Sequence, residues 1–425
     1  MKKNIALLSG IMLASFASVA QEVHQITNIG TMSIQPQTKV STYFNFVNTA
    51  SGNVFNDGEF YFHDDYENDG LFAFSSTQRT GKVVFEGDNK SIQNISGDSP
   101  SIFYNVIFNK SGDDYSFNLS NDISSEGSVD FMDGIVWVNK QEGGAFLFLK
   151  GATHVNASDK SYVEGEVNKK GNEIFKYPIG NKKKYRYAKI SASKNSKDVF
   201  VGKYVFEDED FFNKHVTKSG LIQELNNKEY WIIDRADNTA GDILLTLSWD
   251  ERTTPATLLN DVENNMHIVR WDSDQELWVD EGGVVDMSSK EITTISTVKG
   301  YGVFTLATVK KGWNLEGDVV IYNLVTPDND GKNDYFIIEN INKYPNNRVE
   351  IYNRWGVKVY ETTNYDSNGD GSTNVFTGYS GGKVTVDKNK KLPSGTYYYV
   401  INYEYKDDNG SRMIRKAANL HLESN

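Results

Sequence analysis

Between Gly81 and Gly151 the sequence repeats a short apolar run: Val83-Val84-Phe85, Val106-Ile107-Phe108, Val129-Asp130-Phe131 and Phe146-Leu147-Phe148. The centres of these runs, at residues 84, 107, 130 and 147, are 23, 23 and 17 residues apart. Regular spacing in this range is typical of a solenoid, in which each coil stacks its strands on the next and buries a continuous apolar column. We therefore predict a parallel β-helix; an antiparallel sandwich with similarly spaced strands is the alternative.

The composition extends the β-rich interpretation to the whole chain. Aromatic residues make up 13% of the 425 residues, with 24 Tyr and 23 Phe, and there are only 7 Pro. Gly, Asn and Asp recur between short apolar or alternating runs, which is typical of β-proteins with many turns. We predict an all-β fold with three regions: a β-helix or solenoid-like region at 21–160, a middle β-sandwich at 161–310 and a C-terminal Ig-like β-sandwich at 311–425.

The middle segment contains strand-like runs between Gly- and Asp-rich turns, at Ile243–Trp249, His267–Trp271 and Gly302–Leu306. This pattern favours a β-sandwich. The segment also holds four tryptophans that could line a carbohydrate platform, although large aromatic side chains of β-proteins more often form the core. They are Trp231, Trp249, Trp271 and Trp278.

The first 20 residues have the pattern of a secretory signal peptide. Lys2 and Lys3 form a basic n-region, Ile5–Val19 is mostly apolar, and Ser18-Val19-Ala20 supplies small residues at the cleavage site. Cleavage after Ala20 would leave 425 − 20 = 405 residues. A membrane anchor is the alternative, but the apolar run is shorter than the roughly 20 residues that span a bilayer. The chain contains no Cys, which excludes disulfides and thiolate metal sites.

The chain is acidic, with a formal net charge of −13. This charge argues against nucleic acid as a partner, because phosphate binding requires clustered Lys and Arg. Two clusters of acidic and amide side chains beside Gly could instead provide oxygen ligands for Ca²⁺. Ordinary Asx turns, which use the same residues without a metal, are the alternative. The predicted calcium ligands are Asp328, Asp330, Asn333 and Asp334 in the first cluster, and Asp366, Asn368, Asp370 and Asn374 in the second.

The most specific motifs stand in a fixed order near the C-terminus. They are Thr326-Pro327-Asp328-Asn329-Asp330-Gly331-Lys332-Asn333-Asp334-Tyr335-Phe336, Ile341–Asn347, Val349-Glu350-Ile351-Tyr352-Asn353-Arg354-Trp355-Gly356 and Leu392-Pro393-Ser394-Gly395-Thr396-Tyr397-Tyr398-Tyr399-Val400. With these motifs, residues 319–422 resemble the gliding-motility-associated C-terminal domain of the Bacteroidetes, which is the type B sorting signal of the type IX secretion system. One element departs from that family: Phe376-Thr377-Gly378 stands where a Trp-Asp-Gly element is usual.

The resemblance implies export through the periplasm and the outer membrane by the type IX secretion translocon, to the cell surface or the medium. It also implies an outer-membrane barrel of the PorP/SprF family as a partner, and a connection with gliding or surface adhesion. Surface polysaccharide and other adhesin subunits are further partners expected of such a protein.

We therefore expect a non-catalytic surface protein, adhesin-like or structural, and not an enzyme. The alternative is a secreted polysaccharide-degrading enzyme, since a β-helix groove can carry carboxylates at the separations that glycosidases use. Gly378-Tyr379-Ser380-Gly381-Gly382 matches G-x-S-x-G, but a nucleophile elbow requires a strand before the serine and a helix after it. The flanking sequence is rich in turns, so we interpret this match as coincidence.

Overall fold

The computed structural model describes residues 24–424 except 89–90, 113, 220–221, 237–242, 299, 310–318, 382–389 and 408–409. The predicted signal peptide at 1–20 lies outside these residues. Within them the protein is built of strands, apart from two short α-helices, α1 (Glu209–Lys214) and α2 (Val262–Asn265), and two 3-10 turns, η1 (Lys140–Glu142) and η2 (Ile341–Lys343). The all-β prediction is confirmed. No helix among the described residues is long and apolar enough to cross a membrane.

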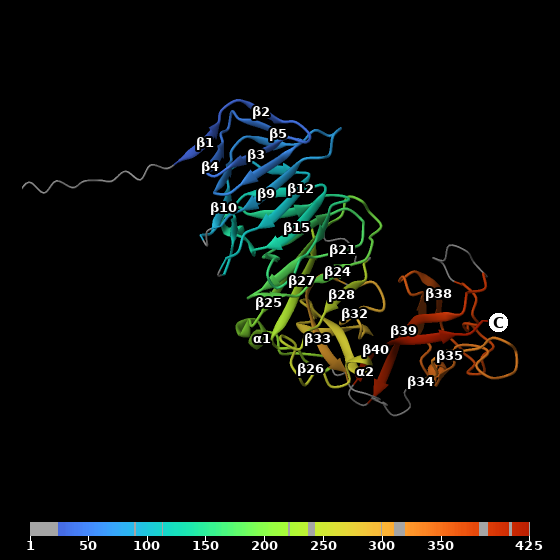
Figure 1. The fold of residues 1–425 in the computed structure, drawn as a ribbon. Helices are drawn as coiled ribbons and strands as arrows, with labels where there is room; N and C mark the ends of the chain where they lie inside the picture. Colours follow the sequence, from blue (N-terminus) through green and yellow to red (C-terminus); the bar gives the residue numbers. More distant parts are fainter. Residues whose placement is uncertain are drawn as a thin grey trace, which may run out of the picture.

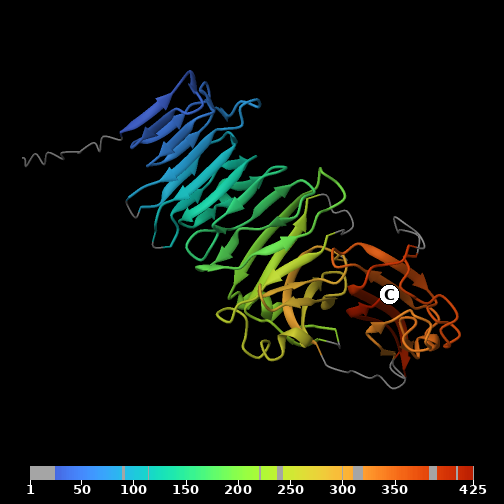
Figure 2. The ribbon, with the colours of Figure 1, turned by 45° about the vertical axis from the view of Figure 1, so that its right-hand side comes forward.

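The N-terminal region is a β-solenoid, and its described part contains six complete coils of three strands each (Figures 1 and 2). Successive coils pair in parallel, so that three sheets run along the rod. Parallel pairing of this kind confirms the predicted β-helix, and the antiparallel alternative is wrong for this region.

Each coil contributes one strand to each of the three sheets. The first sheet contains β1 (Gln25–Asn28), β4 (Asn45–Asn48), β7 (Tyr66–Asn68), β10 (Gln93–Ser96), β13 (Phe117–Leu119), β16 (Val136–Val138), β19 (Val163–Glu164), β22 (Ile179–Asn181) and β23 (Lys184–Tyr185). The solenoid part of the second contains β2 (Thr31–Ile34), β5 (Asn53–Asn56), β8 (Leu71–Ala73), β11 (Ser101–Phe103), β14 (Asp122–Ser125), β17 (Ala145–Phe148) and β20 (Val167–Lys170). The third contains β3 (Lys39–Thr42), β6 (Glu59–Phe62), β9 (Lys82–Glu86), β12 (Asn105–Asn109), β15 (Ser128–Asp133) and β18 (Thr153–Val155).

The repeat that predicted the solenoid follows the inward-facing positions of the third sheet. Four phenylalanine rings stack there in successive coils, at centroid distances of 5.6, 5.7 and 5.8 Å. They belong to Phe62, Phe85, Phe108 and Phe131, which stand in register. Ring stacking adds to the apolar burial that holds the coils together. The fourth predicted run, at 146–148, lies in β17 of the second sheet, which explains its shorter spacing.

The solenoid continues directly into the middle region, because antiparallel strands extend its second sheet. These strands are β25 (Val199–Phe206), β27 (Glu229–Arg235), β33 (Gly302–Val309), β29 (Met266–Asp272) and β30 (Leu277–Gly282), with β26 (Ile222–Leu225) paired to β33. Another sheet contains β21 (Phe175–Lys176), β24 (Ala188–Ile190), β28 (Leu245–Ser248), β32 (Glu291–Thr293) and β31 (Val284–Asp286). One apolar core extends through the solenoid and both sheets, and parallel pairing reaches β22, past the predicted boundary at residue 160.

The tryptophans of the middle region are mainly core residues. Trp231 and Trp278 are fully buried, and Trp249 is 6% exposed. Trp271 is half-buried and its ring lies 5.6 Å from that of Trp278. The core interpretation is therefore confirmed for three of the four side chains.

The C-terminal domain has an apolar core of its own. A five-stranded sheet runs in the order β35 (Leu324–Val325), β40 (Gly410–Leu422), β39 (Gly395–Asp407), β37 (Arg348–Tyr352) and β38 (Lys358–Thr363), and β34 (Val320–Ile321) pairs with β36 (Ile338–Glu339). Figures 1 and 2 show this domain at the opposite end of the molecule from β1. The first described strand of this domain, β34, begins just after Val319, the first residue of the segment that resembles the sorting signal.

Candidate functional surfaces of the C-terminal domain

The first predicted calcium cluster lies in the loop between β35 and β36. The carboxylate oxygens of Asp328, Asp330 and Asp334 lie within 4.8 Å of one another, and all three side chains reach solvent. Backbone amides hold them in place: the Asp334 carboxylate accepts from the amides of Asn329 at 2.6 Å and Gly331 at 2.8 Å. The three carboxylates offer oxygen ligands of the kind that Ca²⁺ takes, and those of Asp328 and Asp330 also accept from the amides of Asp330 and Lys332, as in Asx turns.

The fourth predicted ligand of this loop, Asn333, accepts a hydrogen bond from the Thr326 amide at 2.7 Å through its backbone carbonyl. Asn333 has a φ of 52° and Asn329 a φ of 63°, values in the left-handed region that Asn tolerates better than most residues. The loop therefore turns sharply enough to bring the carboxylates together. Asn333 contributes to this turn through its backbone conformation.

The second predicted cluster lies in the loop between β38 and β39, where its polar side chains bond within the loop. Asp366 is 4% exposed and accepts from the Gly371 amide at 2.9 Å. Hydrogen bonds from the Ser372 hydroxyl and amide lower the pKa of Asp370. The amide group of Asn368 donates to the Thr373 hydroxyl at 2.9 Å, and that of Asn374 donates to backbone carbonyls. These contacts are those of Asx turns, the alternative use of the same residues.

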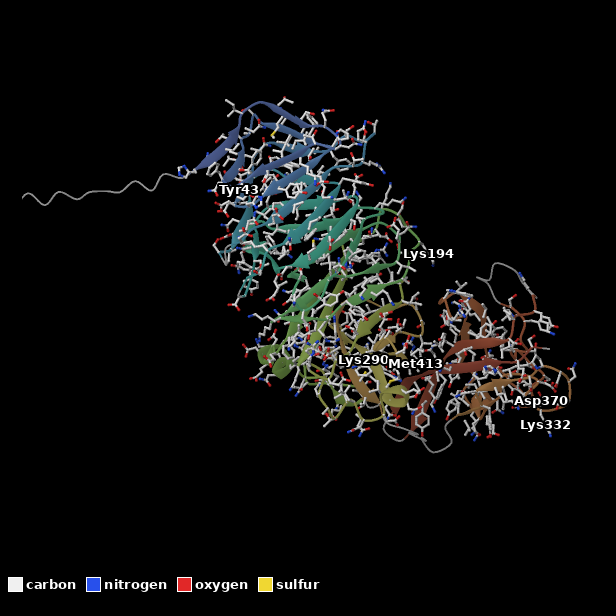
Figure 3. The ribbon with its side chains drawn as sticks, in the orientation of Figure 1. Tyr43, Lys194, Lys290, Lys332, Asp370 and Met413 are labelled. Atoms are coloured by element: carbon white, nitrogen blue, oxygen red, sulfur yellow. The ribbon has the colours of Figure 1, made fainter. Side chains whose placement is uncertain are left out.

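Tyr335 follows the first acidic loop in the chain and lies against the second. A side chain added at Gly371 of the second loop would meet the Tyr335 ring at 2.3 Å, so the contact requires glycine there. Burial, followed by the charges of Asp366 and Asp370, raises the pKa of the Tyr335 hydroxyl. Figure 3 labels Lys332 and Asp370, one from each loop, on the side of the C-terminal domain that lies away from the solenoid in this view.

Arg415 on β40 connects the C-terminal domain with the middle region. Its guanidinium donates to the backbone carbonyl of Asp280 at 3.2 Å and to the Ser296 hydroxyl, and it lies 3.7 Å from the Glu281 carboxylate. Glu281 is fully buried and also pairs with Arg270 at 3.0 Å. Because a buried carboxylate is costly without cationic partners, the two guanidinium groups together stabilise Glu281 in this position.

Apolar side chains complete the contact between the two parts. Ile295 of the middle region packs in one buried cluster with Tyr352 and Val400 of the C-terminal sheet. Gly282 faces Ala417 beside this cluster. Figure 3 shows Met413 and Lys290 near the place where the two parts meet. The contact gives the C-terminal domain a defined orientation on the middle region.

This orientation predicts that an engineered disulfide can join the two parts. A Cβ built on Gly282, whose φ of 78° strains any side chain, lies 3.8 Å from the Ala417 Cβ, within the ~3.5–4.5 Å span of a disulfide. Because the chain has no Cys of its own, the pair Gly282→Cys and Ala417→Cys is expected to form one bond on oxidation, measured as loss of two free thiols. Gly302, whose added Cβ would meet nothing within 4 Å, gives the control pair Gly302→Cys with Ala417→Cys. Equal oxidation of both pairs would contradict the docked arrangement.

The last strand is closed on both sides at its end. β35 pairs with His421 and Leu422, and Leu420 and Leu422 are fully buried in the domain core. These two leucines therefore close the core of the domain. The two-residue strand β35 occupies the outer edge of β40 at its last two residues.

The G-x-S-x-G match lies in a loop. Among the described residues between β38 and β39 there is neither a strand before Ser380 nor a helix after it. The Ser380 hydroxyl accepts a hydrogen bond from the Lys390 amide at 3.1 Å. The described segment therefore lacks the strand and helix that place the serine of a nucleophile elbow.

Comparison with known families gives a match that covers this domain. Residues 319–415 match the family described as CHU_C Type IX secretion signal domain. Residues 319–415 form a type IX secretion signal domain. The predicted sorting domain is confirmed, and the match runs from the buried Val319 to Arg415 at the contact with the middle region. No curated protein and no solved structure matches the chain significantly.

The secretion signal domain determines where the protein goes. A chain that carries it is handled by the type IX secretion system and is exported to the cell surface or the extracellular space. The predicted localisation is therefore confirmed, and the acidic loops and the Arg415 contact lie on a domain that serves export.

Proposed function

We propose that the exported protein is a non-catalytic surface protein, adhesin-like or structural, whose solenoid presents a binding face to surface polysaccharide or other adhesin subunits. The observation that carries this proposal is a secretion signal domain attached to a continuous rod of β-coils. A rod whose coils share one core is a rigid spacer, which suits a protein that must reach beyond the outer membrane. Gliding or surface adhesion is the process in which we place it.

The rival function, polysaccharide cleavage, has a candidate position on the solenoid. A cavity of about 220 Å³ is lined by Asp114, Asp133 and Asp159. Two of these carboxylates are paired with cations: Asp159 with Arg252, and Asp114 with Lys183 at 3.2 Å. A glycosidase requires two carboxyl groups free to act on opposite sides of a sugar ring. The pairing of two of the three carboxylates argues against this cavity as the site of a glycosidase.

We propose further that an outer-membrane barrel of the PorP/SprF family holds the protein at the surface. A protein released by the translocon is lost to the medium unless something binds it. The motifs of this domain stand in the order of a type B sorting signal, and that resemblance implies a barrel of this family as the partner. Cross-linking on intact cells, followed by purification through a tag on the solenoid, is expected to recover the barrel. Recovery of the protein only from the medium, as a species without any cross-linked membrane protein, would contradict this partner.

We also propose that Ca²⁺ binds the first acidic loop. Asp328, Asp330 and Asp334 supply hard oxygen ligands within reach of one ion. An ion that binds only the folded domain stabilises it by about 2.7 kcal/mol at a concentration 100 times its Kd. Millimolar Ca²⁺ is therefore expected to raise the melting temperature of the secretion signal domain, and a chelator is expected to lower it.

Two matched variants assign the ion to a loop. Asp330→Asn removes one of the clustered charges and is expected to abolish the shift that Ca²⁺ causes. Asp370→Asn makes the same change in the second loop and is expected to leave the shift intact, because among the described residues only the first loop brings three carboxylates within 4.8 Å of one another. If Ca²⁺ fails to raise the melting temperature of Asp370→Asn alone, the ion binds the second loop. If it fails to raise that of the unsubstituted protein, the calcium proposal is contradicted.

A further inference from the structure

The solenoid begins with an open end. The three strands of the first coil, β1, β2 and β3, are the terminal strands of their sheets. Among the described residues no strand pairs with their outer edges, whereas β4, β5 and β6 of the second coil pair on both sides. Figures 1 and 2 show this end as the tip of the rod, far from the secretion signal domain. Backbone groups on such edges are available to a strand of another molecule.

In the part of the chain that the structure describes, nothing covers the apolar columns of the solenoid at this end. Three side chains of the first coil occupy inward-facing positions above fully buried residues of the second coil. The aligned pairs are Ile26 with Phe46, Met32 with Val54 and Val40 with Phe60. Ile26 is 43% exposed, although Phe46 below it is 1% exposed, and Met32 and Val40 are only partly buried. A further layer of β-structure would complete the burial of all three.

A ladder of asparagines also ends here. The side-chain amide of Asn28 donates to the Asn48 oxygen at 2.8 Å, and that of Asn48 donates to the Asn68 oxygen at 2.7 Å. Each side-chain oxygen below the first accepts from the coil before it. The oxygen of Asn28 has instead a contact of 3.4 Å with the Gly30 amide of its own turn. Another strand placed on β1 could donate to this oxygen and extend the ladder.

The described residues of the open end carry almost no charge. Residues 24–56 contain no Asp or Glu, although the whole chain has a net charge of −13. The one Lys in this stretch, Lys39, is paired with Glu59 at 3.0 Å. Ile29, Tyr43 and Phe44 are exposed beside the edges, and Figure 3 shows Tyr43 at this part of the rod. Proteins usually protect exposed sheet edges with charged side chains, so an uncharged apolar edge indicates a surface that another chain covers.

We propose that this end binds the same end of a second copy of the protein, head to head, through the outer edges of the first coil. A strand paired in antiparallel with its own copy about a two-fold axis is self-complementary, because it offers both donors and acceptors. Two copies of an acidic chain repel each other over most of their surface, and they can approach at the first coil, whose described residues include no Asp or Glu. The pairing covers Ile26, Met32 and Val40 and places the two secretion signal domains at opposite ends of the dimer.

The test uses the full chain that begins at Gln21, with its mass measured by light scattering or sedimentation over a range of concentrations. The expected result is a dimer. The double variant Ile26→Lys with Met32→Lys places cations on the two-fold contact and is expected to raise the dissociation constant roughly tenfold or more. The control is Ile174→Lys, which makes the same change at an isoleucine that is 67% exposed elsewhere, and it is expected to remain dimeric.

Circular dichroism and thermal unfolding check that the variants fold. If the double variant does not fold, Thr27→Lys changes an exposed side chain on β1 without touching the apolar columns. A monomer at every concentration would overturn the proposal. A dimer whose dissociation constant is the same in the double variant and in Thr27→Lys as in the unsubstituted protein would also overturn it. So would an assembly larger than a dimer, because a head-to-head contact closes after two copies.

Discussion

Deleting residues 319–425 is expected to leave the protein in the periplasm and to reduce its amount on the cell surface to background. The type IX secretion signal domain occupies 319–415, so the deletion removes the part that the secretion system handles. The remaining chain keeps the solenoid and the middle region, which share a core that does not include the deleted residues. The measurement is surface labelling of intact cells together with fractionation of the periplasm.

A converse experiment separates loss of the signal from damage to the rest of the protein. The deletion uncovers Ile295 and Glu281, which the C-terminal domain covers in the intact chain. Fusing residues 310–425 to an unrelated periplasmic reporter is expected to bring that reporter to the surface, since the domain has its own core. Normal surface exposure of the truncated protein would contradict the first expectation, and a reporter that stays in the periplasm would contradict the second.

The solenoid could be predicted because its stabilising contacts recur at equal distances along the chain. Phe85, Phe108 and Phe131 are neighbours in space because each coil returns the chain to the same position. The sequence could not show that 146–148 belongs to another sheet, since apolar runs in different sheets of one coil look alike. It could not show the boundary of the solenoid either, because β20 pairs with a parallel strand on one side and an antiparallel strand on the other.

The candidate sites were predictable to different degrees. Asp328, Asp330 and Asp334 lie within seven residues of one another, so local turn chemistry alone brings them together. Arg415 and Glu281 are separated by more than a hundred residues, and nothing beside either residue distinguishes it from a solvated charge. Their contact depends on the docking of two domains. The open end of the solenoid could not be predicted either, because the sequence of a strand does not show whether another strand pairs with it.

The second large effect is expected on stability, from a buried ion pair in the middle region. Glu229 on β27 is fully buried, and Arg186 is 2% exposed. The guanidinium of Arg186 donates to the Glu229 carboxylate at 3.1 and 3.3 Å and also bonds Ser248. Glu229 accepts further hydrogen bonds from Tyr204 at 2.7 Å and Thr254 at 2.6 Å. These groups bind β27 of one sheet to the end of β28 in the other, so the pair holds the two sheets of the middle region together.

Glu229→Gln is expected to destabilise the protein by about 3–5 kcal/mol, because it leaves the Arg186 guanidinium buried without a counter-charge. The control is Glu251→Gln, the same substitution at a carboxylate that pairs with Lys290 at 2.7 Å while both side chains are about half exposed. Solvent screens such a surface pair, and the expected cost is within about 1 kcal/mol. Denaturant unfolding of the full chain measures both. Adding Arg186→Met to Glu229→Gln is expected to recover part of the loss, because the uncompensated charge is then gone. Equal costs for Glu229→Gln and Glu251→Gln would mean that the buried pair does not hold the two sheets together.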